Sequence, residues 1–257
     1  MTPSESQPRP ALPGVSQEPR GARDPGPEPF EIWNVWESGA GNAAANMAWD
    51  EALLLHAGET SRPVLRFYGW TEPAASFGYF QRFADVARQT PLRPIVRRPT
   101  GGGLVPHDAD WTYAVVLPAG HPWYALRAEA SYLRLHRWLQ AAFARLGIET
   151  RLAAEPRQVQ PGCCFEGYER NDLLWQGRKL AGAAQRRTRA GLLIQGSVQP
   201  PPAFGITRTQ WHQAMLEAAR EVWSVKWESW TPPLSMEGTM RSLLETKYGR
   251  PEYHQRR

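Results

Sequence analysis

The order of the apolar segments after residue 30 constrains the fold of this chain most strongly. Short runs that resemble strands, such as PVLRFYGW (63–70), PIVRRP (94–99) and WTYAVVLP (111–118), are interrupted by Gly and Pro. Long amphipathic segments at 129–147 and 208–223 carry apolar residues at helical spacing. Strands and helices do not alternate regularly, so the sequence predicts an α+β fold with a mixed, largely antiparallel sheet flanked by helices.

The composition changes sharply near Phe30. Residues 1–29 hold eight of the 24 prolines and almost no large apolar side chains, which is typical of a segment that cannot repay the entropy of ordering. We therefore expect a disordered Pro-rich leader over 1–29 and one catalytic domain over 30–257. The leader has three arginines and four acids, so the domain carries a formal charge of +6 while the whole chain carries +5. This charge fits acidic partners but does not by itself choose among classes of partner.

The cellular context follows from what the sequence lacks. The only cysteines, Cys163 and Cys164, are neighbours, an arrangement that rarely permits a relaxed disulfide. No apolar stretch approaches the roughly 20 residues of a spanning helix, and the N-terminus lacks the order of a signal peptide. The twelve tryptophans are dispersed and do not interleave with a basic run. We expect a cytoplasmic protein that binds neither membrane nor nucleic acid.

A glycine-rich segment, RRPTGGGLVPHD (97–108), is the first candidate for chemistry. Three glycines let backbone amides approach a ligand, and the arginines can hold a carboxylate or phosphate. The alternative is a strand corner flanked by solvated arginines. The segment lacks the ending of a P-loop and the spacing of a dinucleotide fingerprint.

A second candidate, GCCFEGYERNDLLWQGRKLAGAAQRR (162–187), contains the cysteine pair and Lys179. A cysteine becomes a nucleophile as the thiolate, which a nearby cation or base supports, so the pair suggests acyl transfer. The alternative is a small buried cysteine and a solvated lysine at a strand edge. The six histidines form no metal-binding pattern, so no metal site is expected.

Taken together, the segments resemble the family of lipoate-protein ligase A, octanoyltransferases and biotin ligases from about Phe30 onward. Five blocks occur in the expected order: NMAWDEALL, PVLRFYGWTEPAASFGYFQ, VRRPTGGGLVPHDADWTY, GRKLAGAAQRR and IQGSV. A closing KYG-type segment follows them. The resemblance implies a biotin/lipoate protein ligase-like catalytic domain in which the glycine segment walls an acyl pocket.

The resemblance also implies site residues. The segment CFEGYERNDL aligns with the pattern CFxxPSxYELV of a cysteine-dependent octanoyltransferase branch, which places Cys164 on the nucleophile. Lys179 would be its catalytic partner. The implied substrate-binding residues are Arg98, Thr100, Gly101, Gly102, Gly103, Val105, His107 and Asn171. The chain departs from its relatives at Gln195, where they often have histidine, and in replacing the PS of the pattern.

Three functions remain open at this level. The first is transfer of an octanoyl or lipoyl group from acyl carrier protein, through a Cys164 thioester and without a cofactor, to a lipoyl-domain lysine. Acceptors would be the glycine-cleavage H protein or the E2 subunit of a 2-oxoacid dehydrogenase. The second is an ATP- and Mg-dependent lipoate-protein ligase that forms an acyl-adenylate. The third is a non-catalytic domain that binds acyl carriers.

Overall fold

The computed structural model describes residues 30–157 and 167–256. Its large sheet has eight strands in the order β11-β1-β2-β6-β10-β9-β8-β7. Their bounds are β1 (Glu31–Gly41), β2 (Val64–Trp70), β6 (Trp111–Pro118), β7 (Arg151–Leu152), β8 (Leu173–Trp175), β9 (Arg178–Arg187), β10 (Gly191–Val198) and β11 (Val225–Ser229). A small sheet, in the order β4-β3-β5, contains β3 (Ala74–Phe77), β4 (Ile95–Arg97) and β5 (Val105–His107).

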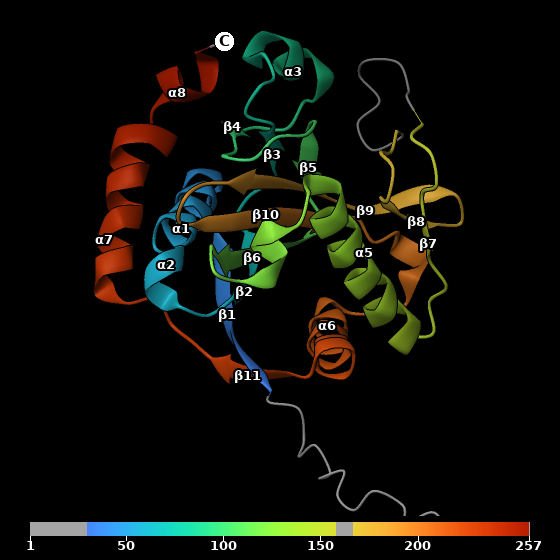
Figure 1. The fold of residues 1–257 in the computed structure, drawn as a ribbon. Helices are drawn as coiled ribbons and strands as arrows, with labels where there is room; N and C mark the ends of the chain where they lie inside the picture. Colours follow the sequence, from blue (N-terminus) through green and yellow to red (C-terminus); the bar gives the residue numbers. More distant parts are fainter. Residues whose placement is uncertain (1–29, 158–166, 257) are drawn as a thin grey trace, which may run out of the picture.

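Helices surround the two sheets. They are α1 (Ala43–Leu55), α2 (Ala57–Thr60), α3 (Phe83–Gln89), α4 (Pro122–Ala125), α5 (Ala128–Arg145), α6 (Arg208–Trp223), α7 (Leu234–Leu243) and α8 (Pro251–Gln255), with the 3-10 turn η1 (Pro202–Phe204) and the π turn η2 (Leu244–Tyr248). Figure 1 shows α3 and α8 beside the small sheet, at one end of the molecule. The predicted leader, residues 1–29, lies outside the described residues.

The pairing of strands confirms the predicted α+β class. Strand β1 pairs in parallel with β2 and β11, whereas β2–β6, β6–β10, β10–β9, β9–β8 and β8–β7 are antiparallel. The segments DLLWQG (172–177), RKLAGAAQRR (178–187) and GLLIQGSV (191–198) predict a meander with a tight turn at Gly177. Strands β8, β9 and β10 form this meander, with Gly177 at φ 76° in the turn between the first two. Glycine tolerates this left-handed conformation without strain.

Both faces of the large sheet are covered, because apolar residues of the central strands alternate between them. On β6, Tyr113 and Val115 belong to the larger core, which includes residues of α5 and α6. Ala114 and Val116 point to the other face and join a core with residues of α1 and α7. Trp33 lies at the centre of the larger core among four other tryptophans. The polar side chains discussed next interrupt the second face.

Some elements differ from the sequence expectation. The segment NAAANMAWDEALLLHAG (42–58) predicts a helix that stops at Gly58, but a second short helix continues to Thr60. The segment IETRL (148–152) predicts a strand, of which only β7 forms. Helices α3 and α8 and the parallel strand β11 were not predicted. Each is short and depends on a distant partner for its stability, which local patterns do not reveal.

Candidate active site

The glycine loop, Thr100–Gly103, is held by Arg98 from inside. Arg98 Nε and Nη2 donate to the carbonyl of Gly101 at 3.1 and 2.7 Å, and Nη2 also donates to the carbonyl of Gly103 at 2.7 Å. Its third nitrogen donates to the backbone and hydroxyl oxygens of Ser76 at 3.2 Å. Burial lowers the pKa of Arg98 to about 10. The structure therefore shows Arg98 shaping the loop, and its expected contact with substrate remains a prediction.

The loop packs tightly against β3 and β9. A Cβ on Gly78 would stand 1.9 Å from the carbonyl oxygen of Gly102, so only glycine permits this approach. Gly102 itself has φ +83°, and a Cβ there would contact Ala184 at 3.4 Å. The loop thus borders the strand that carries Lys179, five residues before Ala184 and roughly 17 Å away along the strand.

A buried polar network fixes the loop from the sheet side. The hydroxyl of Thr100 donates to Gln195 Oε1 at 2.7 Å, and Gln195 Nε2 donates to Asp50 Oδ2 at 2.6 Å. Asp50 on α1 also accepts from Arg66 at 2.6 Å and from the hydroxyl of Tyr68 at 2.9 Å. The hydroxyl of Thr100 therefore donates its hydrogen bond within the protein. Gln195 provides both a donor and an acceptor to this chain of bonds.

His107 is similarly enclosed. Its Nε2 lies 2.8 Å from the Ser76 hydroxyl and its Nδ1 lies 2.8 Å from Asp110 Oδ2, while Trp70 stacks on its ring at 3.8 Å. Because His107 is only 4% exposed and bridges Asp110 to Ser76, we interpret it as support for Arg98, which also bonds Ser76. A direct contact of His107 with substrate stays a prediction.

Lys179 forms an ion pair with a buried carboxylate. Its Nζ lies 2.7 Å from Asp172 Oδ2, and the Asp172 side chain is fully buried. The same oxygen accepts the backbone N–H of Glu169 at 2.8 Å. The pair thus fixes the Lys179 side chain, which is 16% exposed, on β9.

Tyr132 on α5 completes this group. Its hydroxyl donates to Asp172 Oδ1 in a very short hydrogen bond and accepts the N–H of Ala183 at 3.2 Å. Burial and the neighbouring Asp172 raise the pKa of Tyr132 well above its usual value. Asp172 is therefore held by three donors and in turn fixes Lys179.

The closing part of the chain braces the other side of the glycine segment. The backbone N–H of Arg97 donates to His254 Nδ1 at 3.0 Å, and Arg97 Nη2 donates to the His254 carbonyl at 2.8 Å. Nearby, Glu51 on α1 accepts from Lys247 Nζ at 2.5 Å and from the Tyr248 hydroxyl at 2.7 Å. The KYG-type segment consequently contacts both α1 and the RR pair.

The remaining predicted residues are placed as follows. Cys164 and its neighbour Cys163 lie outside the described residues. Asn171 adopts a left-handed conformation, φ 68°, directly before Asp172, and its N–H donates to the carbonyl of Ala153 at 2.8 Å. Val105 begins β5 and is partly exposed. Thus Lys179 and Asn171 lie close to Asp172, whereas Arg98, the glycines and His107 form a second group.

Sequence reasoning missed several residues that build the site. Asp172 falls on the Glu of the pattern CFxxPSxYELV, a position to which the sequence assigns no role, and Tyr132 lies on an amphipathic helix with nothing to distinguish it. Asp50 and Asp110 are single acids within apolar stretches, and a buried acid in such a stretch is the signal that could have identified them.

The part of the chain that the structure describes contains no helix long and apolar enough to cross a membrane. Among those same residues, no group of three or more His, Cys, Asp or Glu side chains is placed to hold a metal ion.

The α+β architecture, with a glycine loop beside Ala184 of β9 and a buried Asp172–Lys179 pair farther along the same strand, is that of a lipoate-protein ligase-like catalytic domain. The chain belongs to the lipoyl protein ligase A/B catalytic domain family, whose sequence model matches residues 42–199. The family resemblance seen in the sequence is thereby confirmed.

Two relatives show the extent of the match. The chain is 36% identical over 182 residues to octanoyltransferase LipM of Staphylococcus epidermidis, covering 65% of this chain and 66% of that protein. It is 35% identical over 184 residues to octanoyltransferase LipM of Geobacillus kaustophilus, covering 65% of each. The chain therefore spans slightly less than two thirds of the length of these curated relatives.

Solved structures share the fold. Lipoate-protein ligase A bound with ATP superposes with a TM-score of 0.70 at 18% identity, covering 88% of this chain and 98% of that one. A bi-partite lipoate protein ligase from Thermoplasma acidophilum, studied with its E2 lipoyl domain, gives a TM-score of 0.68 at 18% identity and covers 88% and 97%. These likenesses establish the fold, and the predicted architecture is confirmed.

Proposed function

We propose that the protein is an octanoyltransferase of protein lipoylation. It takes an octanoyl group from acyl carrier protein onto Cys164 and passes it to a lysine of a lipoyl domain. Relatives named octanoyltransferase, at 35–36% identity, support the reaction class. The observation that carries the mechanism is the Lys179–Asp172 pair. Asp172, which follows Cys164 by eight residues in the sequence, holds the Lys179 cation.

The first half-reaction is a thioester exchange. The Cys164 thiolate attacks the carbonyl carbon of the donor thioester, the carrier's sulfur leaves, and a proton is returned to that sulfur. The bond broken and the bond formed are both thioesters, so no ATP is required. The Lys179 ammonium would stabilise the attacking thiolate and can donate the proton to the leaving sulfur.

The second half-reaction forms an amide. The amine of a lipoyl-domain lysine attacks the Cys164 thioester, the Cys164 sulfur leaves, and the proton lost by the amine neutralises it. An amide is more stable than a thioester, so this step is downhill. In this proposal Lys179 relays that proton, and Asp172 keeps its side chain in position.

The glycine loop supplies candidates for oxyanion stabilisation. The C=O and N–H of a trans peptide unit point in opposite directions. Because Arg98 binds the carbonyls of Gly101 and Gly103, the following N–H groups, of Gly102 and Leu104, turn away from Arg98. An amide aimed at the oxyanion of an acyl-transfer intermediate typically contributes about 3–4 kcal/mol.

A second candidate is an ATP-dependent lipoate ligase in which Arg98, Asn171 and Lys179 hold an acyl-adenylate and Cys164 is incidental. This alternative is supported by the fold that the chain shares with lipoate-protein ligase A bound with ATP. The donors of Arg98 are directed at its own loop, which leaves fewer of them for a phosphate. A non-catalytic carrier-binding domain would not need the buried Lys179–Asp172 pair.

One set of incubations separates these functions. The purified chain is mixed with octanoyl-acyl carrier protein and a lipoyl domain, or with octanoate and ATP-Mg, and lipoyl-domain mass is followed. We expect octanoylation from the carrier without ATP. Modification only from free octanoate with ATP would replace the proposal with the ligase, and none under either condition would favour the non-catalytic domain.

A further inference from the structure

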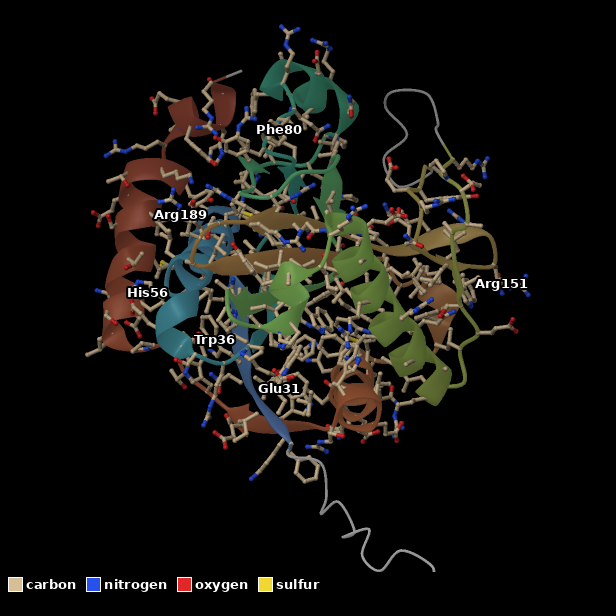
Figure 2. All side chains as sticks on the ribbon, in the orientation of Figure 1. Glu31, Trp36, His56, Phe80, Arg151 and Arg189 are labelled. Atoms are coloured by element: carbon tan, nitrogen blue, oxygen red, sulfur yellow. The ribbon has the colours of Figure 1, made fainter. Side chains whose placement is uncertain are left out.

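An exposed aromatic side chain lies beside the glycine loop. Phe80 is 74% exposed and follows Gly78, the residue that packs against Gly102, by two positions. Its ring is 5.2 Å from that of Tyr79, whose backbone N–H donates to the carbonyl of Thr100 at 2.8 Å. The aromatic pair is thereby fixed beside the glycine loop with the Phe80 side chain exposed. Figure 2 shows Phe80 near α3, at the end of the molecule where α8 also lies.

Arginines surround this aromatic pair. Arg82 and Arg88, on and next to α3, have side chains 75% and 73% exposed. The guanidinium of Arg256 lies 4.7 Å from the Tyr79 ring, and that of Arg186 lies 5.9 Å from it. Phe80 and these four arginines are called the basic rim below.

The basic rim keeps a positive excess after its ion pairs are counted. Asp85 pairs with both α3 arginines, at 3.9 and 2.6 Å, and neutralises one of them. Glu51 is shared by Arg186 and Lys247, so one charge is left there as well. The hydrogen bond and charge of Arg256 lower the pKa of Tyr79. An acidic surface is the complement of such a region.

We propose that the basic rim docks the acidic acyl carrier protein that donates the octanoyl group, with Phe80 as the apolar anchor. The inference rests on the proposed function and assigns its donor a binding surface. Arginine and aromatic side chains are the residue types that most often carry binding energy at protein interfaces. Arg82 and Arg88 set the encounter rate and orientation of the carrier.

The distance from the basic rim to Lys179 favours the acyl carrier protein, the donor, over the lipoyl domain, the acceptor, as the protein that docks there. Arg186 lies on β9, seven residues beyond Lys179, which corresponds to roughly 23 Å along an extended strand. A lysine side chain from a docked acceptor is far too short for that distance. An acyl carrier presents its thioester at the end of a long flexible prosthetic arm, which passes along the glycine loop toward Lys179.

Binding is tested directly with octanoyl-acyl carrier protein and the full chain at low ionic strength. We expect the double variant Arg82→Glu/Arg88→Glu to raise Kd at least tenfold and Phe80→Ala to raise it several-fold. The matched controls are Arg151→Glu, where the side chain is 83% exposed, and Leu234→Ala, where the residue is 83% exposed. Figure 2 shows Arg151 far from Phe80. Both controls should stay within about twofold of the unchanged protein.

A second measurement separates docking from catalysis. Acylation by octanoyl-pantetheine, an uncharged thioester that lacks the carrier's acidic surface, should be unchanged in the rim variants. Undetectable binding by the unchanged protein, equal Kd in the rim variants, or equal weakening in the controls would each overturn the docking surface. If neither donor yields an acyl-enzyme, the proposed function fails, while the Kd comparison still decides whether the rim binds the carrier.

Discussion

Lys179 lies across the face of Gly182. A Cβ at position 182 would stand 2.7 Å from Lys179 Cε and 2.8 Å from its Nζ, and 3.1 Å from Asp172 Oδ1. The missing side chain of Gly182 is therefore the space in which the ion pair forms. Since the nearest atoms belong to the far end of a flexible side chain, a methyl group there would displace the lysine and leave the strand intact.

Gly182→Ala should accordingly lower the rate of acyl-enzyme formation by about tenfold or more, because a misplaced catalytic group loses orientation. The thermal midpoint should fall as well, because the displaced lysine leaves the buried carboxylate of Asp172 without its cation. Gly238→Ala, at a helical position with no atom within 4 Å of the added Cβ, is the control and should keep full activity. Full activity of Gly182→Ala would show that the observed position of Lys179 is not needed.

The contributions of the Lys179–Asp172 ion pair to catalysis and to stability can be measured separately. Lys179→Met should slow acylation by roughly 10²–10⁴-fold, the usual loss for a general acid or base. It should also destabilise the fold by about 3 kcal/mol, because the fully buried Asp172 loses its cation. Adding Asp172→Asn should restore most of that stability and none of the rate. Urea unfolding reports the stability, and intact mass of samples quenched at successive times reports the rate of acylation.

The cysteine pair gives the sharpest chemical test. Cys164→Ser should abolish a hydroxylamine-sensitive octanoyl-enzyme seen by intact mass, whereas Cys163→Ser should leave it. Successive residues of an extended segment point to opposite sides, so both thiols cannot face Lys179 equally if the segment is extended. Retention of full activity by Cys164→Ser with ATP and free lipoate would transfer the proposal to the ligase.

Acid should destabilise the protein through His136. Burial lowers the pKa of His136 to about 4, below the ordinary 6.5, with Asp172 opposing the shift. The unfolded chain then binds the proton more readily, so stability present above pH 6.5 is lost as the pH falls toward 4. At pH 5 the loss from this group is about 2 kcal/mol.

The variant His136→Asn should reduce the slope of unfolding free energy between pH 7 and 5, whatever its absolute stability. Part of the slope should remain, because burial also lowers the pKa of His254. Urea titrations at several pH values provide the comparison. An unchanged slope would contradict the assignment to His136.

Local sequence patterns were sufficient for the strands of the meander and for α5 and α6, because each has a clear period or turn residue. They also located the glycine loop and Lys179. They could not predict that Arg98 faces its own loop, since a guanidinium has the same sequence signal whether it binds a ligand or a carbonyl. Tyr132 was beyond reach for a different reason: its bond to Asp172 joins residues 40 positions apart.

The bond between Arg97 and His254 has a consequence for how the protein is made. The two residues are 157 positions apart, so a ribosome releases the glycine segment long before it releases its brace. Strand β1 likewise precedes its parallel partner β11 by most of the domain. Contacts of such long sequence separation slow folding. The nascent chain must therefore hold the segment that carries its family signature in an unfinished state until the residues around His254 have been synthesised.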